Sequence, residues 1–239
     1  SYCGLARERE MDSGARSFIR VPWPVKPLND VLDRIAASRV VQRVCLSMTT
    51  NSRSRRDVVP LARRIAERGR RAVSILIAPT LMDRPALEAL REAGVDRVGV
   101  AFDLPTEELF DTHRGQGARG PHRWENYWRV FADAVEVFGK RMVGSHFIVG
   151  LGETEREMAG AMQRVVDGGG VNHLFSFFPE AGSALARRDL PPMDVYRRMQ
   201  IAAELLDSGR SRAERMTFDP ETGRLLDFGV TAEDRKSVV

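Results

Sequence analysis

Residues 142–154 read Met-Val-Gly-Ser-His-Phe-Ile-Val-Gly-Leu-Gly-Glu-Thr, a short apolar run followed by a glycine-rich turn. The run Met142–Val149 is nearly continuous in apolar character, which is typical of a strand buried on both faces of a parallel sheet. Beyond the turn, Thr154–Val166 places apolar residues at helical spacing. This order predicts a strand that leads through a tight turn into a helix.

The same unit recurs along the chain. Four further apolar runs are Val40–Ser47, Ala72–Ile77, Arg97–Phe102 and Val171–Phe177. Helical spacing is found in Leu28–Ala37, Asp57–Arg68, Pro85–Ala93, Trp124–Phe138 and Pro192–Leu206. Alternating strands and helices predict repeated βαβ units with right-handed crossovers, which form either a barrel or a doubly wound sheet. The spacing does not separate these two folds.

Composition narrows the class of protein. The chain has 239 residues, of which 43% are hydrophobic and 29% charged, and this suits one globular domain. Its net charge of +4 is spread over mixed-charge stretches such as Leu61–Arg71, which predicts a solvated surface and no nucleic-acid partner. No apolar run has the roughly 18 residues that a membrane span needs, so no membrane partner is expected. Two distant cysteines predict no disulfide framework and favour a cytoplasmic location.

Ligand sites in parallel α/β folds lie at the carboxyl ends of the strands, so the residues just after each run are the candidates. Asp103 ends the third run, where its carboxylate suits sugar hydroxyls; the alternative is that it caps the next helix. Thr49 follows the first run and suits a polar head group, or belongs to a capping loop. Gly150 and Gly152 allow a close backbone approach to a flat ligand, or form a tight turn.

Other chemically active side chains are scattered. Glu180, after the fifth run, either faces the barrel mouth or belongs to a turn. The four histidines do not have metal-ligand spacing, and His146 and His173 are predicted to be interior histidines at alternating strand positions. Cys45 lies inside a predicted strand and is expected to be a buried thiol. Arg114, His122 and Trp124 are candidates for a substrate entrance.

Three segments together resemble the radical S-adenosylmethionine enzymes. Tyr2-Cys3 followed by Gly4-Leu5-Ala6 looks like the end of their Cys-x3-Cys-x-aromatic-Cys loop. The stretch 147–154 resembles the adenine-binding strand end of the biotin synthase branch, and Asp103 before Pro-Thr-Glu-Glu-Leu-Phe resembles its ribose-contacting segment. The order and spacing match over nearly the whole chain.

The resemblance implies an α/β fold, a partial TIM-type (β/α)6 barrel over residues 1–215 whose first strand is missing, with a C-terminal extension over 216–239 that carries the turn signal Asp219–Gly223. It also implies a [4Fe–4S] cluster and S-adenosylmethionine as cofactors. Cys3 would ligate iron. The implied cofactor-binding residues are Tyr2, Thr49, Asp103, Ile148, Val149, Gly150, Gly152 and Glu153. Two cluster cysteines and the strand before them are absent, so a fragment truncated at its N-terminus is expected. Met48-Thr49-Thr50-Asn51 stands in place of the usual Gly-Gly-Glu, which leaves the contacts to the cofactor's amino group open.

The segment Arg16–Pro24 resembles the two-protein lipoyl synthase group. That likeness implies sulfur insertion into an octanoyl chain, with a second radical S-adenosylmethionine subunit and a lipoyl-carrier protein as partners. Two alternatives stay open: an unrelated barrel enzyme of the aldolase-like kind, and a non-catalytic barrel that serves as a subunit.

Overall fold

The computed structural model describes residues 25–230, and five strands in this range form one parallel sheet. They are β1 (Arg43–Ser47), β2 (Ala72–Ile77), β3 (Val95–Asp103), β4 (Val143–Val149) and β5 (Val171–Ser176). Their order in the sheet is their order in the sequence. A doubly wound sheet reverses its strand order at a switch point, whereas a barrel sheet does not. The fold is therefore the partial α/β barrel, as predicted.

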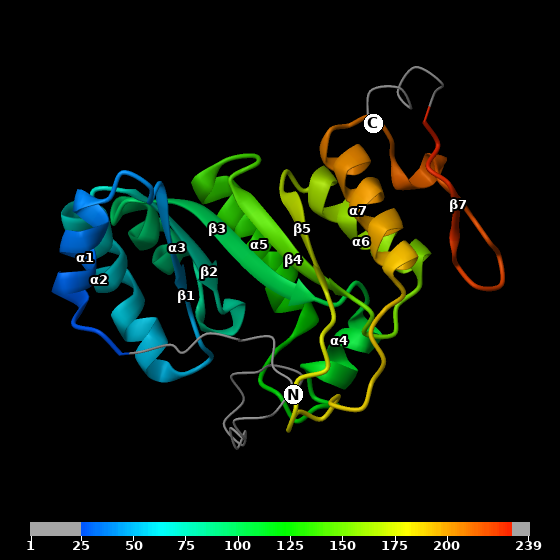
Figure 1. Ribbon diagram of the computed structural model, residues 1–239, viewed down its shortest axis with the longest axis horizontal. Coiled ribbons are helices and arrows are strands. Elements are labelled where there is room, and N and C mark those ends of the chain that lie inside the picture. The colour runs from blue at the N-terminus through cyan, green and yellow to red at the C-terminus, as the bar shows by residue number, and fades with distance from the viewer. Residues whose placement is uncertain (1–24, 231–239) are drawn as a thin grey trace.

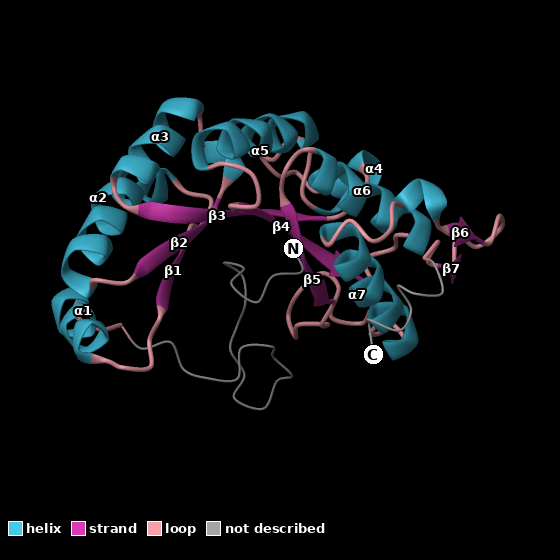
Figure 2. Cartoon of the chain, turned by 90° about the horizontal axis from the view of Figure 1, so that it is seen from above, coloured by secondary structure: helices cyan, strands magenta, loops and turns pink. Residues whose placement is uncertain are grey.

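Seven α-helices and two 3-10 turns are described between residues 25 and 230. They are α1 (Leu28–Ala37), α2 (Ser52–Gly69), η1 (Pro79–Leu81), α3 (Arg84–Glu92), α4 (Glu107–His113), α5 (Trp124–Phe138), α6 (Glu155–Asp167), α7 (Met193–Asp207) and η2 (Ala213–Arg215). Figure 1 shows the elements in order, and Figure 2 shows the strands along an arc with α2, α3, α5 and α6 on its outer side. None of these helices combines the length and apolarity needed to cross a bilayer.

Helix bounds follow the sequence signals closely. The structure has α1 and α5 at their predicted bounds. The helix α2 begins at Ser52 rather than Asp57, because Asn51 accepts a hydrogen bond from the Ser54 amide and caps it. The short helix α4 was not delimited by the apolar pattern, since seven residues hold too few turns to show a period.

The inner strands β2, β3 and β4 are buried mainly on one face, not on both as predicted, and β1 and β5 have no buried residue. In β2, Val73, Ile75 and Ile77 are buried against the helices, whereas Ser74 and Leu76 on the other face are half-buried. The helices cover only the convex face, so the concave face of the arc keeps partial exposure (Figure 2). The prediction of a buried Cys45 thiol is wrong for the same reason: Cys45 pairs in register with Ser74 and is exposed.

Aromatic rings pack on the convex face around Phe102, which is fully buried. Its ring centroid lies 4.3 Å from that of Trp128 and 5.8 Å from that of Phe147. Further rings within about 6 Å belong to Trp124, Tyr127 and Phe131. These contacts join β3, β4 and α5 in one core and so hold the end of β3 in place.

The strand β5 is an edge of the described sheet, and α7 covers its polar groups. The Asp207 carboxylate accepts the Asn172 amide at 3.0 Å, and the Tyr196 hydroxyl donates to the Leu174 carbonyl at 3.1 Å. Two backbone groups that face outward from the sheet are thereby paired with side chains of α7.

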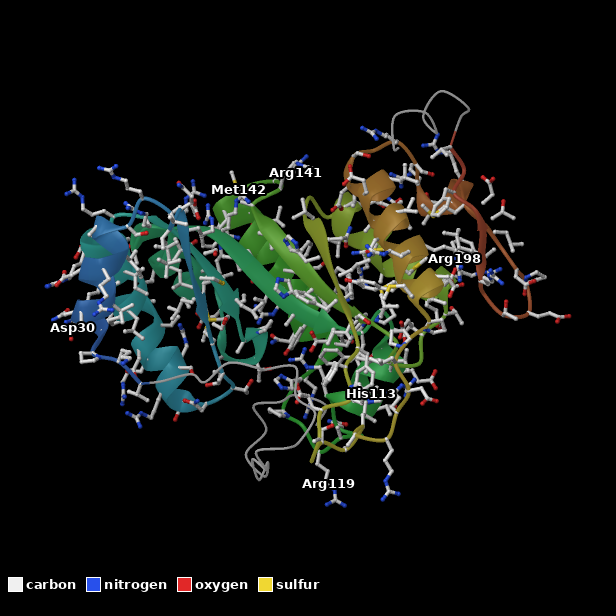
Figure 3. All side chains as sticks on the ribbon, in the orientation of Figure 1. Asp30, His113, Arg119, Arg141, Met142 and Arg198 are labelled. Carbon is white, nitrogen blue, oxygen red and sulfur yellow. The ribbon has the colours of Figure 1, made fainter. Side chains whose placement is uncertain are left out.

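A small hairpin of β6 (Thr217–Phe218) and β7 (Leu225–Asp227) follows α7, and the turn signal Asp219–Gly223 lies between its two strands. The Leu225 amide donates to Glu155 Oε2 at 2.7 Å. The same carboxylate pairs with Arg198 of α7 at 2.6 Å, and Glu155 is only 7% exposed. One buried carboxylate therefore joins α6, α7 and the hairpin; Figure 3 labels Arg198 there.

We expect Phe102→Ala to lower the free energy of unfolding by about 4 kcal/mol, because it removes a fully buried ring and leaves a cavity among five aromatic neighbours. Urea denaturation followed by circular dichroism measures the loss. The matched control is Phe175→Ala, since Phe175 on the open face is 44% exposed. A loss below about 1 kcal/mol for Phe102→Ala would show that this aromatic cluster does not hold β3.

Candidate active site

Parallel pairing brings every strand-to-helix turn to one edge of the sheet, the lower edge in Figure 1. Asp103 is the last residue of β3 and lies in register with Phe147 of β4. Ile148 and Val149, the last two residues of β4, therefore lie beside it, followed by the Gly150–Glu153 turn. Thr49 follows β1, two strands away from β3. The described candidates thus share one edge, while Tyr2 and Cys3 lie outside the described residues.

Thr49 belongs to the polar turn that starts α2. Its hydroxyl accepts from Asn51 Nδ2 at 2.7 Å and lies 3.1 Å from Ser54 Oγ. The first turn of α2 contains no acidic side chain, so its positive helix end is not compensated there. The turn presents hydroxyl groups and helix N–H groups at the edge, which suits an anionic or polar head group.

Asp103 occupies the left-handed region with a φ of 65°. Its carboxylate pairs with Arg114 at 2.7 Å, and both side chains are largely buried, at 15% and 17% exposure. The capping alternative for Asp103 is wrong, because Thr106 Oγ1 accepts the Leu109 amide and caps α4. A strained backbone that holds a paired carboxylate at a strand end is typical of a binding site.

The Gly150–Glu153 turn is closed by its own glutamate. Glu153 accepts the Gly150 amide at 2.6 Å and the Leu151 amide at 2.9 Å. Gly150 and Gly152 have φ values of 107° and 119°, which only glycine adopts without strain. Burial raises the pKa of the Glu153 carboxyl, although the two amides act in the opposite sense. Glu153 therefore shapes the turn through two backbone bonds.

The segment after β5 lies against this turn. Arg188 Nε donates to the Gly150 carbonyl at 2.8 Å, and a Cβ on Gly150 would lie 2.9 Å from the Pro191 ring. On the other side, His113 Nε2 lies 3.2 Å from the Leu151 carbonyl oxygen. Glu180, in the same segment, is 4% exposed and thus buried. The Gly150–Glu153 turn is therefore contacted on one side by Arg188 and on the other by His113.

Two imidazoles lie on the concave face. The ring centroids of His146 and His173 are 5.4 Å apart in an edge-to-face arrangement. Glycines on the adjacent strands make room for them: a Cβ on Gly99 would lie 3.2 Å from His146 Nε2, and one on Gly144 would lie 2.6 Å from His173 Cδ2. Burial, together with the nearby His173, lowers the pKa of His146 to about 4. His146 is therefore a neutral, half-buried imidazole. The prediction of an interior histidine is wrong for His173, which is exposed on the edge strand β5.

The predicted entrance residues have mostly internal roles. Trp124 packs edge-on against Phe102, with ring centroids 5.8 Å apart. His122 Nδ1 lies 2.9 Å from the Tyr127 hydroxyl and 2.8 Å from Thr80 Oγ1. Burial is the main cause that lowers the pKa of His122 to about 4. In Figure 3, Arg119 of the intervening loop points away from the body of the chain.

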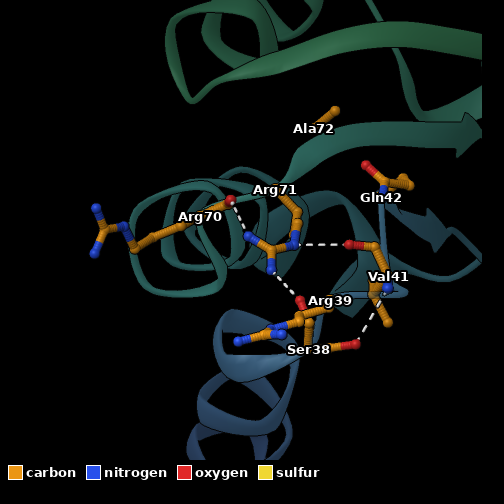
Figure 4. Close-up of a pocket in the computed structure, with 7 residues that line it drawn as sticks. All are labelled: Ser38, Arg39, Val41, Gln42, Arg70, Arg71 and Ala72. Carbon is orange, nitrogen blue, oxygen red and sulfur yellow. Dashed lines mark hydrogen bonds between the residues drawn. The ribbon is translucent and has the colours of Figure 1, made fainter.

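A cavity of about 520 Å³ lies at the opposite, amino edge of the sheet (Figure 4). Arg71 lines this cavity and donates to the Val41 carbonyl at 2.7 Å and to the Ala36 carbonyl at 3.2 Å. The guanidinium also donates to the Ser38 carbonyl. Arg71 therefore closes the end of α1, and this cavity has a structural explanation.

The edge fits the nucleoside part of S-adenosylmethionine. Asp103 supplies an oriented carboxylate, and the half-buried Ile148 beside it supplies apolar surface. For the cluster, no group of three or more His, Cys, Asp or Glu side chains among residues 25–230 could hold a metal. The iron ligand expected from the sequence, Cys3, lies outside that range.

Residues 1–165 match the radical SAM superfamily, so the chain belongs to this superfamily, whose members use a [4Fe–4S] cluster and S-adenosylmethionine. This finding excludes the unrelated aldolase-like barrel. No curated protein matches the sequence significantly.

One solved structure supports the fold, and two others are similar at lower TM-scores. Methylornithine synthase (PylB) is similar with a TM-score of 0.60 and 15% identity, over 75% of this chain and 52% of that one. Coproporphyrinogen III oxidase (HemN) from Escherichia coli, a radical SAM enzyme, has a TM-score of 0.49 and 19% identity, over 75% of this chain and 45% of that one. The radical S-adenosylmethionine methyltransferase TsrM from Kitasatospora setae, with cobalamin and a [4Fe–4S] cluster bound, has a TM-score of 0.43 and 19% identity, over 63% of this chain and 31% of that one. The chain spans about half the length of methylornithine synthase.

Sequence reasoning did not identify the partners of the candidate residues. Arg114 was placed at an entrance, yet it binds Asp103. Arg188 was not singled out at all, yet it binds Gly150. The sequence carried no signal for either contact, because both arginines lie outside the periodic segments.

We expect stability to fall as the pH is lowered from 7 to 4. A folded pKa near 4, below the ordinary 6.5, means that His146 binds a proton more readily when unfolded. Its neutral form therefore stabilises the fold above pH 6.5, and this contribution of about 3 kcal/mol is lost toward pH 4. In His146→Gln the slope of the unfolding free energy against pH between 6.5 and 4 should become shallower, while His122 and His113, whose pKa values burial also lowers, keep their share. Denaturant titrations at several pH values measure it, and an unchanged slope would contradict the burial of His146.

Proposed function

We propose that the chain binds S-adenosylmethionine at the carboxyl edge of its sheet and uses it in radical chemistry. The observation that carries the proposal is the adjacency of the Asp103 carboxylate and the end of β4 at this edge, in a chain of the radical SAM superfamily. When bound, the cluster supplies the electron that cleaves the sulfonium and yields a 5′-deoxyadenosyl radical able to abstract a hydrogen.

The roles of the residues follow from their positions. Asp103 accepts hydrogen bonds from the ribose hydroxyls, and Ile148 packs against the adenine. Val149 is 1% exposed, so it contributes through its backbone. Gly150 and Gly152 keep the turn free of side chains, and Glu153 holds the turn closed.

The other end of the cofactor is assigned to the first strand and the cysteine loop. The hydroxyl of Thr49 contacts the amino-acid part of the cofactor. Tyr2 places backbone near the adenine, and Cys3 ligates iron. The concave face around His146 and His173 receives the substrate.

For the reaction itself we propose sulfur insertion of the lipoyl or biotin synthase kind, in the cytoplasm. Its support is the likeness of residues 147–154 and Arg16–Pro24 to those enzymes. The partners would be a second radical SAM subunit and a lipoyl-carrier protein. A single-chain assay with an octanoylated carrier peptide, with and without that subunit, separates this role from that of a non-catalytic subunit.

We expect the protein, in a form that carries the complete cysteine loop, to produce 5′-deoxyadenosine after anaerobic cluster reconstitution and reduction. Liquid chromatography with mass spectrometry detects the product. A loaded cluster without cleavage would refute the mechanism. Cys3→Ala should abolish cluster binding, because the loop loses a thiolate ligand. Cys45→Ala is the matched control, and equal iron content in Cys3→Ala and the control would show that Cys3 is not a ligand.

We expect Asp103→Ala to weaken S-adenosylmethionine binding by about tenfold, because a charge-assisted hydrogen bond to the ribose is lost. Isothermal titration calorimetry measures the affinity. The control is Asp96→Ala, which removes an ion-paired carboxylate from the opposite end of the same strand. Equal affinities of the two variants would leave Asp103 without a binding role.

A further inference from the structure

Arg114 reaches back across α4 to the end of β3. It follows the last residue of α4 directly, and its Nη1 donates to Asp103 Oδ2 at 2.7 Å. The same nitrogen donates to the Ala101 carbonyl and lies 3.5 Å from the Phe102 carbonyl oxygen. One guanidinium group therefore contacts three consecutive residues, at the place where the register of β3 shifts and Asp103 turns left-handed.

This backbone conformation needs such support. A non-glycine residue at a φ of 65° costs free energy and persists only where its surroundings hold it. The Arg114 guanidinium restrains the Asp103 side chain, and the same group binds the carbonyl two residues earlier. The direction of the Asp103 carboxylate is thus tied to the position of Arg114.

Arg114 is itself held in place by Tyr127. Its Nη2 donates to the Tyr127 hydroxyl at 3.1 Å, and its guanidinium carbon lies 5.3 Å from the centroid of that ring. Tyr127 is fully buried in α5. A guanidinium group only donates, so the tyrosine oxygen accepts and its single proton points elsewhere.

His122 Nδ1 lies 2.9 Å from the Tyr127 oxygen. Thr80 Oγ1, in the turn after β2, lies 2.8 Å from the same nitrogen. These contacts join the turn after β2, the start of α5 and the end of β3.

We infer that Arg114 is a positioning residue for nucleoside binding: held by Tyr127 and His122, it orients the Asp103 carboxylate toward the ribose. The inference rests on the proposed function, since it assumes that a nucleoside occupies this edge. Its effect is specific to ligands that carry ribose hydroxyls, which a merely structural role of Arg114 would not produce.

The test compares two probes by isothermal titration calorimetry on the full chain: S-adenosyl-L-homocysteine and its 2′,3′-dideoxy analogue. Arg114→Gln should lower the affinity for S-adenosylhomocysteine about tenfold and change the affinity for the dideoxy analogue by no more than about twofold. Guanidinium ion added at low millimolar concentration should restore the affinity of this variant for S-adenosylhomocysteine. Arg119→Gln is the matched control, because Arg119 is an exposed arginine of the same loop. Equal weakening of both probes, or none, overturns the inference.

A second variant covers the case in which Arg114→Gln does not fold. Tyr127→Phe keeps the ring in its aromatic contacts and removes only the hydroxyl that holds Arg114. The affinity for S-adenosylhomocysteine should therefore fall about threefold, while the affinity for the dideoxy analogue should not change. Wild-type affinity for both probes in Tyr127→Phe overturns the inference. Failure of the wild-type chain to bind S-adenosylhomocysteine would instead refute the proposed function, so the two failures are distinguishable.

Discussion

Parallel pairing of the five strands is the constraint on which the rest of the structure depends. Because each strand runs in the same direction, every chain reversal needs a crossover, and each crossover here is a helix on the convex face. The strand ends therefore gather at one edge, and residues more than 40 positions apart, Asp103 and Phe147, come into register. The one-sided helix layer leaves side chains of the concave face, such as Ser74 and Leu76, half-buried.

Much of the fold could be predicted from periodicity. The strands at 72–77 and 143–149 and the helices at 28–37 and 124–138 follow directly from apolar spacing. Two features of the fold could not be predicted in this way. The strands were expected to be buried on both faces, because Val and Ile runs do not tell whether a helix layer covers one face or two. The helix α4 is too short for a period, and its start depends on one capping hydroxyl, that of Thr106.

The site was predictable as a set of positions, but not as a set of interactions. Strand ends could be located from the sequence, so Asp103 and Gly150 were found. Their partners Arg114 and Arg188 come from loops, where no period constrains which side chain returns to the sheet. The exposure of Cys45 follows from register, which a single strand's sequence does not contain. Side-chain pairing across elements is a property of the assembled fold, and only local spacing can be computed from a linear pattern.

The covered edge of β5 has a consequence for the protein in a crowded solution. An unpaired strand edge is a template for any extended chain that meets it, and this is a common start of aggregation. Asp207 and Tyr196 of α7 occupy part of that template with side chains, so an incoming strand would have to displace two hydrogen bonds before it gained any. A sequence change at either residue would expose this edge of β5 to other copies of the chain.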